Sequence, residues 1–240
     1  MTTAPEGILL VNKPAGVTSH DVVQVLRRRL GVRRIGHTGT LDPMAEGLLV
    51  LLVGQATRLQ QAFQGHDKVY RATIALGTQT DTADAAGQPI RTAPVPPLAA
   101  PAVRELLAGF LGPVLQVPPA YSAVKVRGRP AYWWTRRQQP VTLAQRRVQL
   151  YTIELLDLDA ARLAIRVGCS AGTYVRTLAE AIGERLGTVA HVAALTREGI
   201  GSFRLEDSRP LDWFRAAEAA DIRACLLPTP AAGAAPVGRR

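Results

Sequence analysis

One carboxylate, Asp42, stands in a polar run punctuated by glycine, residues 36–43, which is followed by an apolar stretch. Pro43 biases Asp42 away from helical backbone angles, and this indicates a sharp corner. An ionised carboxylate held there suits a nucleophile or a base better than a general acid. A simpler interpretation makes Asp42 the N-cap of a helix, with residues 44–52 as the buried helix or strand that follows. The two interpretations of Asp42 are compatible, because a helix N-terminus stabilises the carboxylate anion.

A second chemical signal is the absence of acidic residues from 106 to 153. In RNA recognition, cationic side chains bind phosphates, and aromatic side chains stack on the unstacked bases of loops. The pattern favours an RNA-binding segment, although half-buried aromatic residues on an ordinary basic hairpin remain the alternative. The basic and aromatic side chains of this segment are Lys125, Arg127, Arg129, Arg136, Arg137, Arg146 and Arg147 with Tyr121, Tyr132, Trp133 and Trp134.

Arg176 is the third candidate, because we expect it in the first turn of a helix and off that helix's buried stripe. The backbone dipole mildly disfavours a cation at that end, so a carboxylate or a phosphate should hold it. Asp42 is the carboxylate that we expect to pair with it. A lone surface arginine is the alternative.

The elements that must position these residues alternate between strands and helices. We expect strands at 7–11, 68–76 and 162–169, the second ending at Gly77. Helices are expected from Thr18 to Gly31, near Pro101, and from Val175 to Gly187, and Thr18 with Asp21 forms a capping box. Residues 88–101 form a connector. A cluster of arginines precedes the Asp42 run in the chain: Arg27–Arg29, Arg33 and Arg34. It is either a solvated helix face or a contact for phosphates.

Charge and composition narrow the class of protein. A formal net charge of +10 over 240 residues favours a polyanionic partner, with nucleic acid ahead of an anionic membrane surface. We find neither a membrane span nor a signal peptide, and Cys169 and Cys225 are the only cysteines, so we expect a soluble cytoplasmic protein. No histidine and cysteine spacing fits zinc, and Asp81 and Asp84 do not fit a calcium loop, so no metal is expected.

Six segments together resemble the TruB family of pseudouridine synthases. The resemblance spans residues 7 to about 228. The segments are residues 13–19 (KPAGVTS), 36–43 (GHTGTLDP), 68–70 (KVY) with Gly77, 80–84 (TDTAD), 117–125 (VPPAYSAVK) and 169–178 (CSAGTYVRTL).

The resemblance implies an α+β fold, with a mixed central β-sheet flanked by helices. The catalytic domain would occupy residues 1–228 and include an inserted segment, 119–151, that closes over the RNA. Residues 229–240 would be a disordered tail. The small C-terminal PUA-like domain of many bacterial relatives would be absent, so acceptor-stem contacts would be weaker.

The resemblance also implies an activity, which is isomerisation of the T-loop uridine of tRNA, position 55, to pseudouridine. No metal or organic cofactor is implied. Asp42 matches the catalytic aspartate, Arg176 the arginine that pairs with it, and Tyr70 the tyrosine that stacks on the flipped base. Four further residues would bind substrate: His37, Tyr174, Leu195 and Lys13. The partner would be the T stem-loop of tRNA, bound by a monomer without an obligate protein partner or a membrane.

Other functions remain open at this stage. An RNA-folding chaperone would need the same basic surface and pocket but not Asp42. The guide-RNA-dependent branch of the superfamily would need partner proteins and the C-terminal domain. A membrane-surface protein is disfavoured, because no basic amphipathic helix has a broad apolar face.

Overall fold

The structure, a computed structural model, describes residues 5–229 in two compact units. Of the described residues, the first unit contains 5–69 and 196–229, and the second contains 70–195. Strands β4 (Lys68–Leu76) and β12 (Ala190–Ile200) each contribute residues to both units. The predicted tail at 229–240 lies, except for its first residue, outside the described residues.

The first unit is built on a mixed sheet with the strand order β14-β1-β3-β12. Strand β1 (Gly7–Lys13) runs antiparallel to β3 (Glu46–Val53), from Gly7 opposite Val53 to Lys13 opposite Gly47. Strand β12 is parallel to β3, with Arg197 opposite Gly47. The shorter strands at the margins are β2 (Ile35–His37), β13 (Phe203–Arg204) and β14 (Arg209–Pro210).

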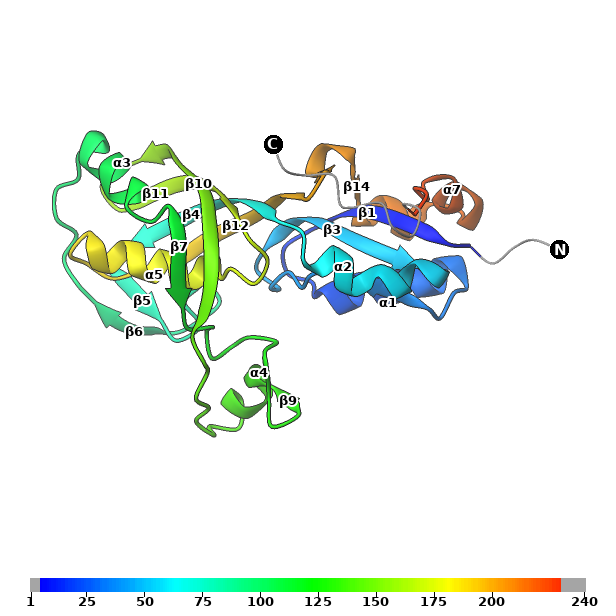
Figure 1. Cartoon of the computed structure of the whole chain (residues 1–240), viewed down its shortest axis with the longest axis horizontal. Helices are drawn as coiled ribbons and strands as arrows, with labels where there is room; N and C mark the ends of the chain where they lie inside the picture. The colour runs from blue at the N-terminus through cyan, green and yellow to red at the C-terminus, as the bar shows by residue number, and fades with distance from the viewer. Residues whose placement is uncertain (1–4, 230–240) are drawn as a thin grey trace. The chain divides into compact units, whose positions relative to one another are not determined.

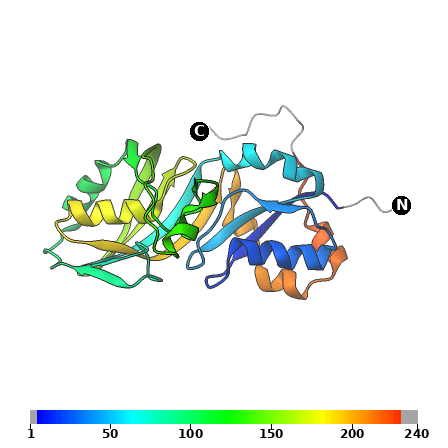
Figure 2. The same ribbon diagram turned by 90° about the horizontal axis from the view of Figure 1, so that it is seen from below.

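Helices cover both faces of this sheet (Figure 2). Alternate residues of β1 divide between the faces: Leu9 and Val11 pack under α1 (Ser19–Leu30), α6 (Leu211–Ala216) and α7 (Ala219–Ala224). Ile8 and Leu10 pack on the other face, against η1 (Gly54–Leu59) and α2 (Gln60–Gln64). Burial on both faces explains why the strands read as continuous apolar runs.

The second unit has its own run of paired strands, in the order β12-β4-β11-β10-β7. The predicted strand at 68–76 is confirmed as β4, whose buried side alternates through Tyr70, Ala72, Ile74 and Leu76. The expected connector at 88–101 contains a short strand, β6, paired with β5. Outside the insert described next, the unit's other elements are β5 (Thr78–Thr80), β6 (Pro89–Thr92), α3 (Ala100–Ala108), β7 (Gly112–Gln116), β10 (Arg146–Leu158), β11 (Arg162–Cys169) and α5 (Val175–Arg185).

An insert of residues 117–145 leaves this second unit between two paired strands. Gln116, the last residue of β7, lies opposite Arg146, the first of β10, so the chain leaves and returns at one place. The insert holds the hairpin β8 (Lys125–Val126) and β9 (Arg129–Pro130) and the short helix α4 (Ala131–Thr135), and it projects beyond the strands of its unit (Figure 1). Residues 146–151 of the segment expected to close over RNA belong to β10.

The predicted capping box at the start of α1 is confirmed. Thr18 Oγ1 accepts a hydrogen bond from the Asp21 backbone N–H (3.1 Å), and Asp21 Oδ2 accepts one from the Thr18 N–H (2.8 Å). Gly31 ends the helix in the left-handed region, with φ 65°. Replacing Thr18 by alanine removes one reciprocal bond and leaves a backbone donor of the first turn without its acceptor.

We therefore expect Thr18→Ala to lower the free energy of unfolding by about 1 kcal/mol. Thr18→Ser, which keeps the hydroxyl, should retain most of the stability. Urea titrations followed by circular dichroism measure both variants. Equal losses in the two would contradict a role for the hydroxyl as a cap.

Candidate active site

Asp42 lies in a tight turn of the first unit, directly before β3. The Ala45 N–H donates to the Asp42 carbonyl (3.1 Å), which closes a turn with Pro43 at its second position. The sequence-based interpretation of Asp42 as the N-cap of a helix is wrong, because the chain enters a strand at Glu46. Strand pairing with β1 on one side and β12 on the other outweighs the local preference of an Asp-Pro pair for a helix start.

Contacts from several parts of the first unit hold this turn. The Gly16 N–H donates to the Pro43 carbonyl (2.8 Å). Ser19 Oγ donates to the Leu41 carbonyl (3.2 Å) and accepts from the Leu41 N–H (2.9 Å), so the first residue of α1 is tied to the residue before Asp42. The Asp42 turn therefore has a defined position relative to α1 and to the loop after β1.

Lys13, the last residue of β1, is fully buried beside this turn. Its ammonium donates to the carbonyls of Pro14 (2.9 Å) and Val17 (2.8 Å). Burial lowers its pKa from 10.5 to about 8, although the nearby Asp42 carboxylate acts to raise it. Lys13 thus brings a positive charge to the vicinity of Asp42, at the cost of its own desolvation.

His37 and Thr38 bring two more polar groups to the same loop. Burial is the main cause of a lowered pKa at His37, and the positive charge of Arg197 adds to it. The imidazole is therefore neutral at pH 7. Within the described part of the chain, His37 Nδ1 and Thr38 Oγ1 are both buried without a hydrogen-bond partner.

Arg176 lies in the first turn of α5 in the second unit, as predicted, but it is only 4% exposed. The alternative of a lone surface arginine is therefore wrong. Its guanidinium donates to the carbonyls of Thr82 (3.0 Å) and Tyr121 (2.9 Å) and lies 3.5 Å from an Asp84 carboxylate oxygen. It thus ties α5 to the turn after β5 and to the insert, while its predicted pairing with Asp42 stays a prediction.

Asp84 is a residue whose role the sequence reasoning missed. Its Oδ1 accepts from the Thr82 hydroxyl (2.7 Å) and from the Ala86 N–H (3.0 Å), and its Oδ2 faces Arg176. The signal available was a short run of aspartate and threonine before a glycine, which is typical of a side chain that organises its own turn.

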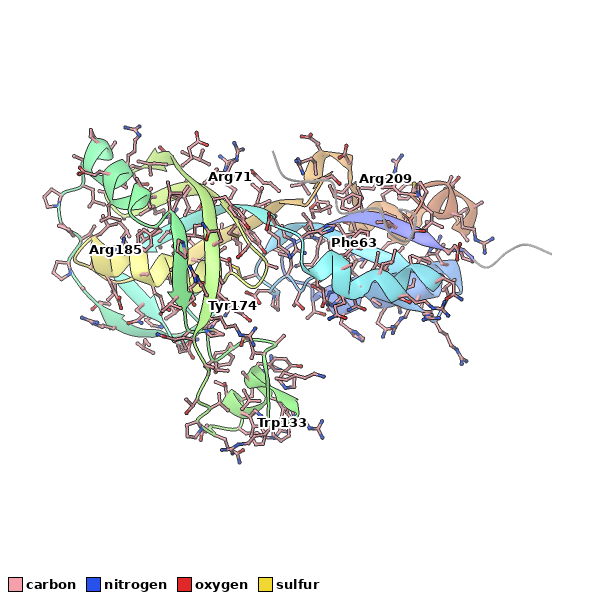
Figure 3. The ribbon with its side chains drawn as sticks, viewed as in Figure 1. Phe63, Arg71, Trp133, Tyr174, Arg185 and Arg209 are labelled. Atoms are coloured by element: carbon pink, nitrogen blue, oxygen red, sulfur yellow. The ribbon has the colours of Figure 1, made fainter. Side chains whose placement is uncertain are left out.

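Three further predicted residues lie in the second unit. Tyr174 precedes α5, where its backbone N–H donates to Gln116 Oε1 (3.0 Å) at the end of β7; Figure 3 labels its side chain. Tyr70, on β4, is 9% exposed, and Leu195, on β12, is 7% exposed. Both are buried positions on strands, so their contributions to a uracil pocket stay predictions.

The insert carries five of the seven predicted cations on its surface, with guanidinium groups over its aromatic rings. Arg137 lies 3.7 Å and Arg129 5.5 Å from the centroid of the Trp133 ring, whose side chain Figure 3 labels. Arg136 lies 5.6 Å from the centroid of Tyr132. The rings thus hold arginines in place, and the exposed guanidinium edges are available to phosphates.

Comparison with known protein families identifies the chain. Residues 27–175 match the model of the TruB family pseudouridylate synthases, N-terminal domain. The chain belongs to the TruB family. A relative from Opitutus terrae named tRNA pseudouridine synthase B is 45% identical over 97% of this chain and 97% of its own length. Relatives of the same name from Aromatoleum aromaticum (44%) and Geobacillus kaustophilus (46%) are matched over 73% of their own lengths, with 94% and 84% of this chain covered.

Solved structures agree with the predicted α+β fold. A chain in a crystal structure of a Cbf5-Nop10-Gar1 complex matches with a TM-score of 0.70 and 28% identity over 92% of this chain. A chain from an H/ACA RNP bound to a substrate RNA containing 2′-deoxyuridine matches with a TM-score of 0.66 and 26% identity, again over 92%. This chain spans 60% and 59% of those two chains.

The described residues hold neither a membrane-spanning helix nor a cluster of metal-ligating side chains. Between residues 5 and 229, no helix is long and apolar enough to cross a membrane. In the same range, histidine, cysteine, aspartate and glutamate side chains nowhere form a group of three or more that could hold a metal ion. The expectation that catalysis needs no metal or cofactor stays a prediction.

The lowered pKa of Lys13 predicts a specific pH dependence of stability. Because its folded-state pKa, about 8, is below the unfolded value of 10.5, the unfolded chain holds more protons between these two values. Stability from this group therefore rises with pH across that window, by up to about 1.4 kcal/mol per pH unit. Below pH 8 Lys13 is charged in both states and adds no slope.

We expect Lys13→Met to lack this rise, so its unfolding free energy should fall behind the wild type as pH increases from 8 to 10. Urea unfolding at several pH values measures the difference. Lys125→Met, at an exposed position of the insert, is the matched control and should parallel the wild type. A constant difference between Lys13→Met and the wild type would contradict the lowered pKa.

Proposed function

We propose that this TruB-family enzyme converts the uridine at position 55 in the T loop of tRNA to pseudouridine, with Asp42 as the catalytic carboxylate. The observation that carries the proposal is the Asp42 turn itself. It presents one carboxylate from a backbone held by α1 and by the Gly16 loop, next to the buried Lys13 ammonium. The shared name of the curated relatives supports tRNA as the substrate.

The reaction breaks the bond between uracil N1 and ribose C1′, rotates the base, and joins C5 to C1′. C5 loses its hydrogen as a proton and N1 gains a proton, so atoms and electrons balance without an oxidant or a reductant. One carboxylate can attack the sugar as a nucleophile, add to the uracil ring, or remove a proton from the sugar. A carboxylate fixed by its backbone meets the demand common to these routes, which is constant geometry during rotation of the uracil.

The target base must leave its stack before Asp42 can act, and flipping costs a few kcal/mol. In the proposal, Tyr70 stacks on the flipped uracil, and Tyr174 and Leu195 complete the uracil pocket. Arg176 acts together with Asp42, and His37 and Lys13 contribute to substrate binding. The neutral state of His37 favours this role, because an uncharged imidazole can approach a nucleobase without desolvating a cation.

The insert supplies the electrostatic part of binding in this proposal. Its five basic side chains, all of them exposed, match a phosphate backbone, and the exposed Arg146 and Arg147 follow directly in β10. The enzyme would work as a monomer without an obligate protein partner. A chain similar to this one is part of a Cbf5-Nop10-Gar1 complex, so the activity of the protein without a partner needs a direct test.

Tritium release from a T stem-loop labelled at uridine C5 tests the reaction directly, because C5 loses its hydrogen when it becomes the glycosidic carbon. We expect release by the wild type, and a rate at least about a thousandfold lower for Asp42→Asn at equal RNA occupancy. Asp207→Asn, an exposed carboxylate of η2 (Leu205–Asp207), is the control and should match the wild type.

Release by both Asp42→Asn and the wild type would remove Asp42 from the mechanism. Tight RNA binding without release by either protein would reject the isomerase and favour an RNA-folding chaperone. Release that appears only after adding a guide RNA or a partner protein would reject the autonomous enzyme.

The arginines on the insert predict a salt-dependent affinity for the same stem-loop. We expect log Kd to rise linearly with log salt concentration, and Arg137→Gln to reduce this slope by about 1, because one phosphate contact is lost. Arg104→Gln, an exposed arginine of α3, is the control. Filter binding at several salt concentrations gives the slopes, and a salt-independent affinity would contradict the electrostatic role of the insert.

A further inference from the structure

Arg197 is a buried cation in the first unit whose position the proposed chemistry does not yet use. It is 1% exposed and among the largest fully buried side chains of the protein. It points inward from β12, where the alternation of that strand would place an apolar residue. Burying a guanidinium is unfavourable unless its donors find acceptors, so its partners should explain its presence.

All the hydrogen bonds of the Arg197 side chain go to backbone carbonyls around the Asp42 turn. Nη2 donates to Gly39 (3.0 Å) and Nη1 to Thr40 (3.4 Å), both before Asp42 in the chain. Nε donates to Leu48 (2.8 Å), which lies after Asp42 in β3. One rigid planar group therefore bridges the two ends of the segment that carries the carboxylate.

The arginine has no carboxylate partner among the described residues, so its role is not that of an ordinary ion pair. Its backbone is also fixed, because β12 pairs in parallel with β3, with Arg197 opposite Gly47. Gly47 has φ 105°, and a Cβ there would lie 2.5 Å from the Arg197 carbonyl oxygen. This close approach fixes the backbone of Arg197 relative to the segment that its guanidinium bridges.

We propose that Arg197 is a positioning residue that fixes the Asp42 turn by joining the carbonyls on both sides of it. Lysine cannot replace it, because a single ammonium lacks the planar fork that reaches carbonyls on both sides together. The inference rests on the proposed function, since it assigns the anchor of the carboxylate that this function uses. A displacement of the order of 1 Å in a catalytic group costs about a hundredfold in rate.

Arg197→Lys tests the fork while keeping the charge, and Arg197→Met removes the buried charge together with its donors. The second variant guards against misfolding, because replacing a buried charge by an apolar side chain of similar volume is often tolerated. Arg204→Lys is the matched control: this exposed arginine of the same unit bonds only the carbonyls of Gly201 and Phe203.

We expect single-turnover tritium release at saturating RNA to fall about 30-fold or more in Arg197→Lys and Arg197→Met, with Kd for the stem-loop within threefold of the wild type. Amide hydrogen exchange should accelerate at residues 38–48 and stay unchanged in β1 and α1. Arg204→Lys should match the wild type in all three measurements.

A wild-type rate in Arg197→Lys and Arg197→Met would overturn the proposal. Exchange that accelerates throughout the first unit would also overturn it, because Arg197 would then stabilise the fold in general. The absence of tritium release from the wild type would reject the proposed function instead, and the exchange measurement would still decide whether Arg197 anchors the turn.

Discussion

Buried cations that donate to backbone carbonyls are the interaction on which the functional loops of this protein depend. Lys13, Arg176 and Arg197 are each almost inaccessible to water, and each donates to at least one carbonyl of an irregular segment. A carbonyl can accept such a bond only if its peptide is correctly oriented, so each cation fixes the path of a loop. Loops ordered in this way can present side chains with the constancy that catalysis requires.

The same interaction shapes the electrostatics around Asp42. Burial costs Lys13 part of its affinity for a proton, and the neighbouring charge of Arg197 adds to this effect. His37 responds to the same field and is neutral at pH 7. Both shifts follow mainly from burial, and the positive charge of Arg197 adds to them.

The insert uses cations differently, because its arginines lie at the surface over aromatic rings. Stacking of Arg137 on Trp133 restricts a flexible side chain before any ligand arrives, which reduces the entropy lost on binding. Sequence reasoning assigned these rings to unstacked bases. The structure shows guanidinium groups over them, and their contact with unstacked bases stays a prediction.

Features set by neighbours in the chain followed from the sequence alone: the capping box of Thr18 and Asp21, the end of α1 at Gly31, and the alternation of β4. They rest on hydrogen bonds within a few residues and on the periods of helix and strand, and the motifs quoted above were enough to indicate the family. Only the tertiary structure decided that Asp42 precedes a strand and not a helix, that Asp84 faces Arg176, and that Arg197 reaches Gly39 and Leu48. These contacts join residues about 90 to 160 positions apart, and strand pairing brings β12 beside β3 in a way that no local spacing encodes.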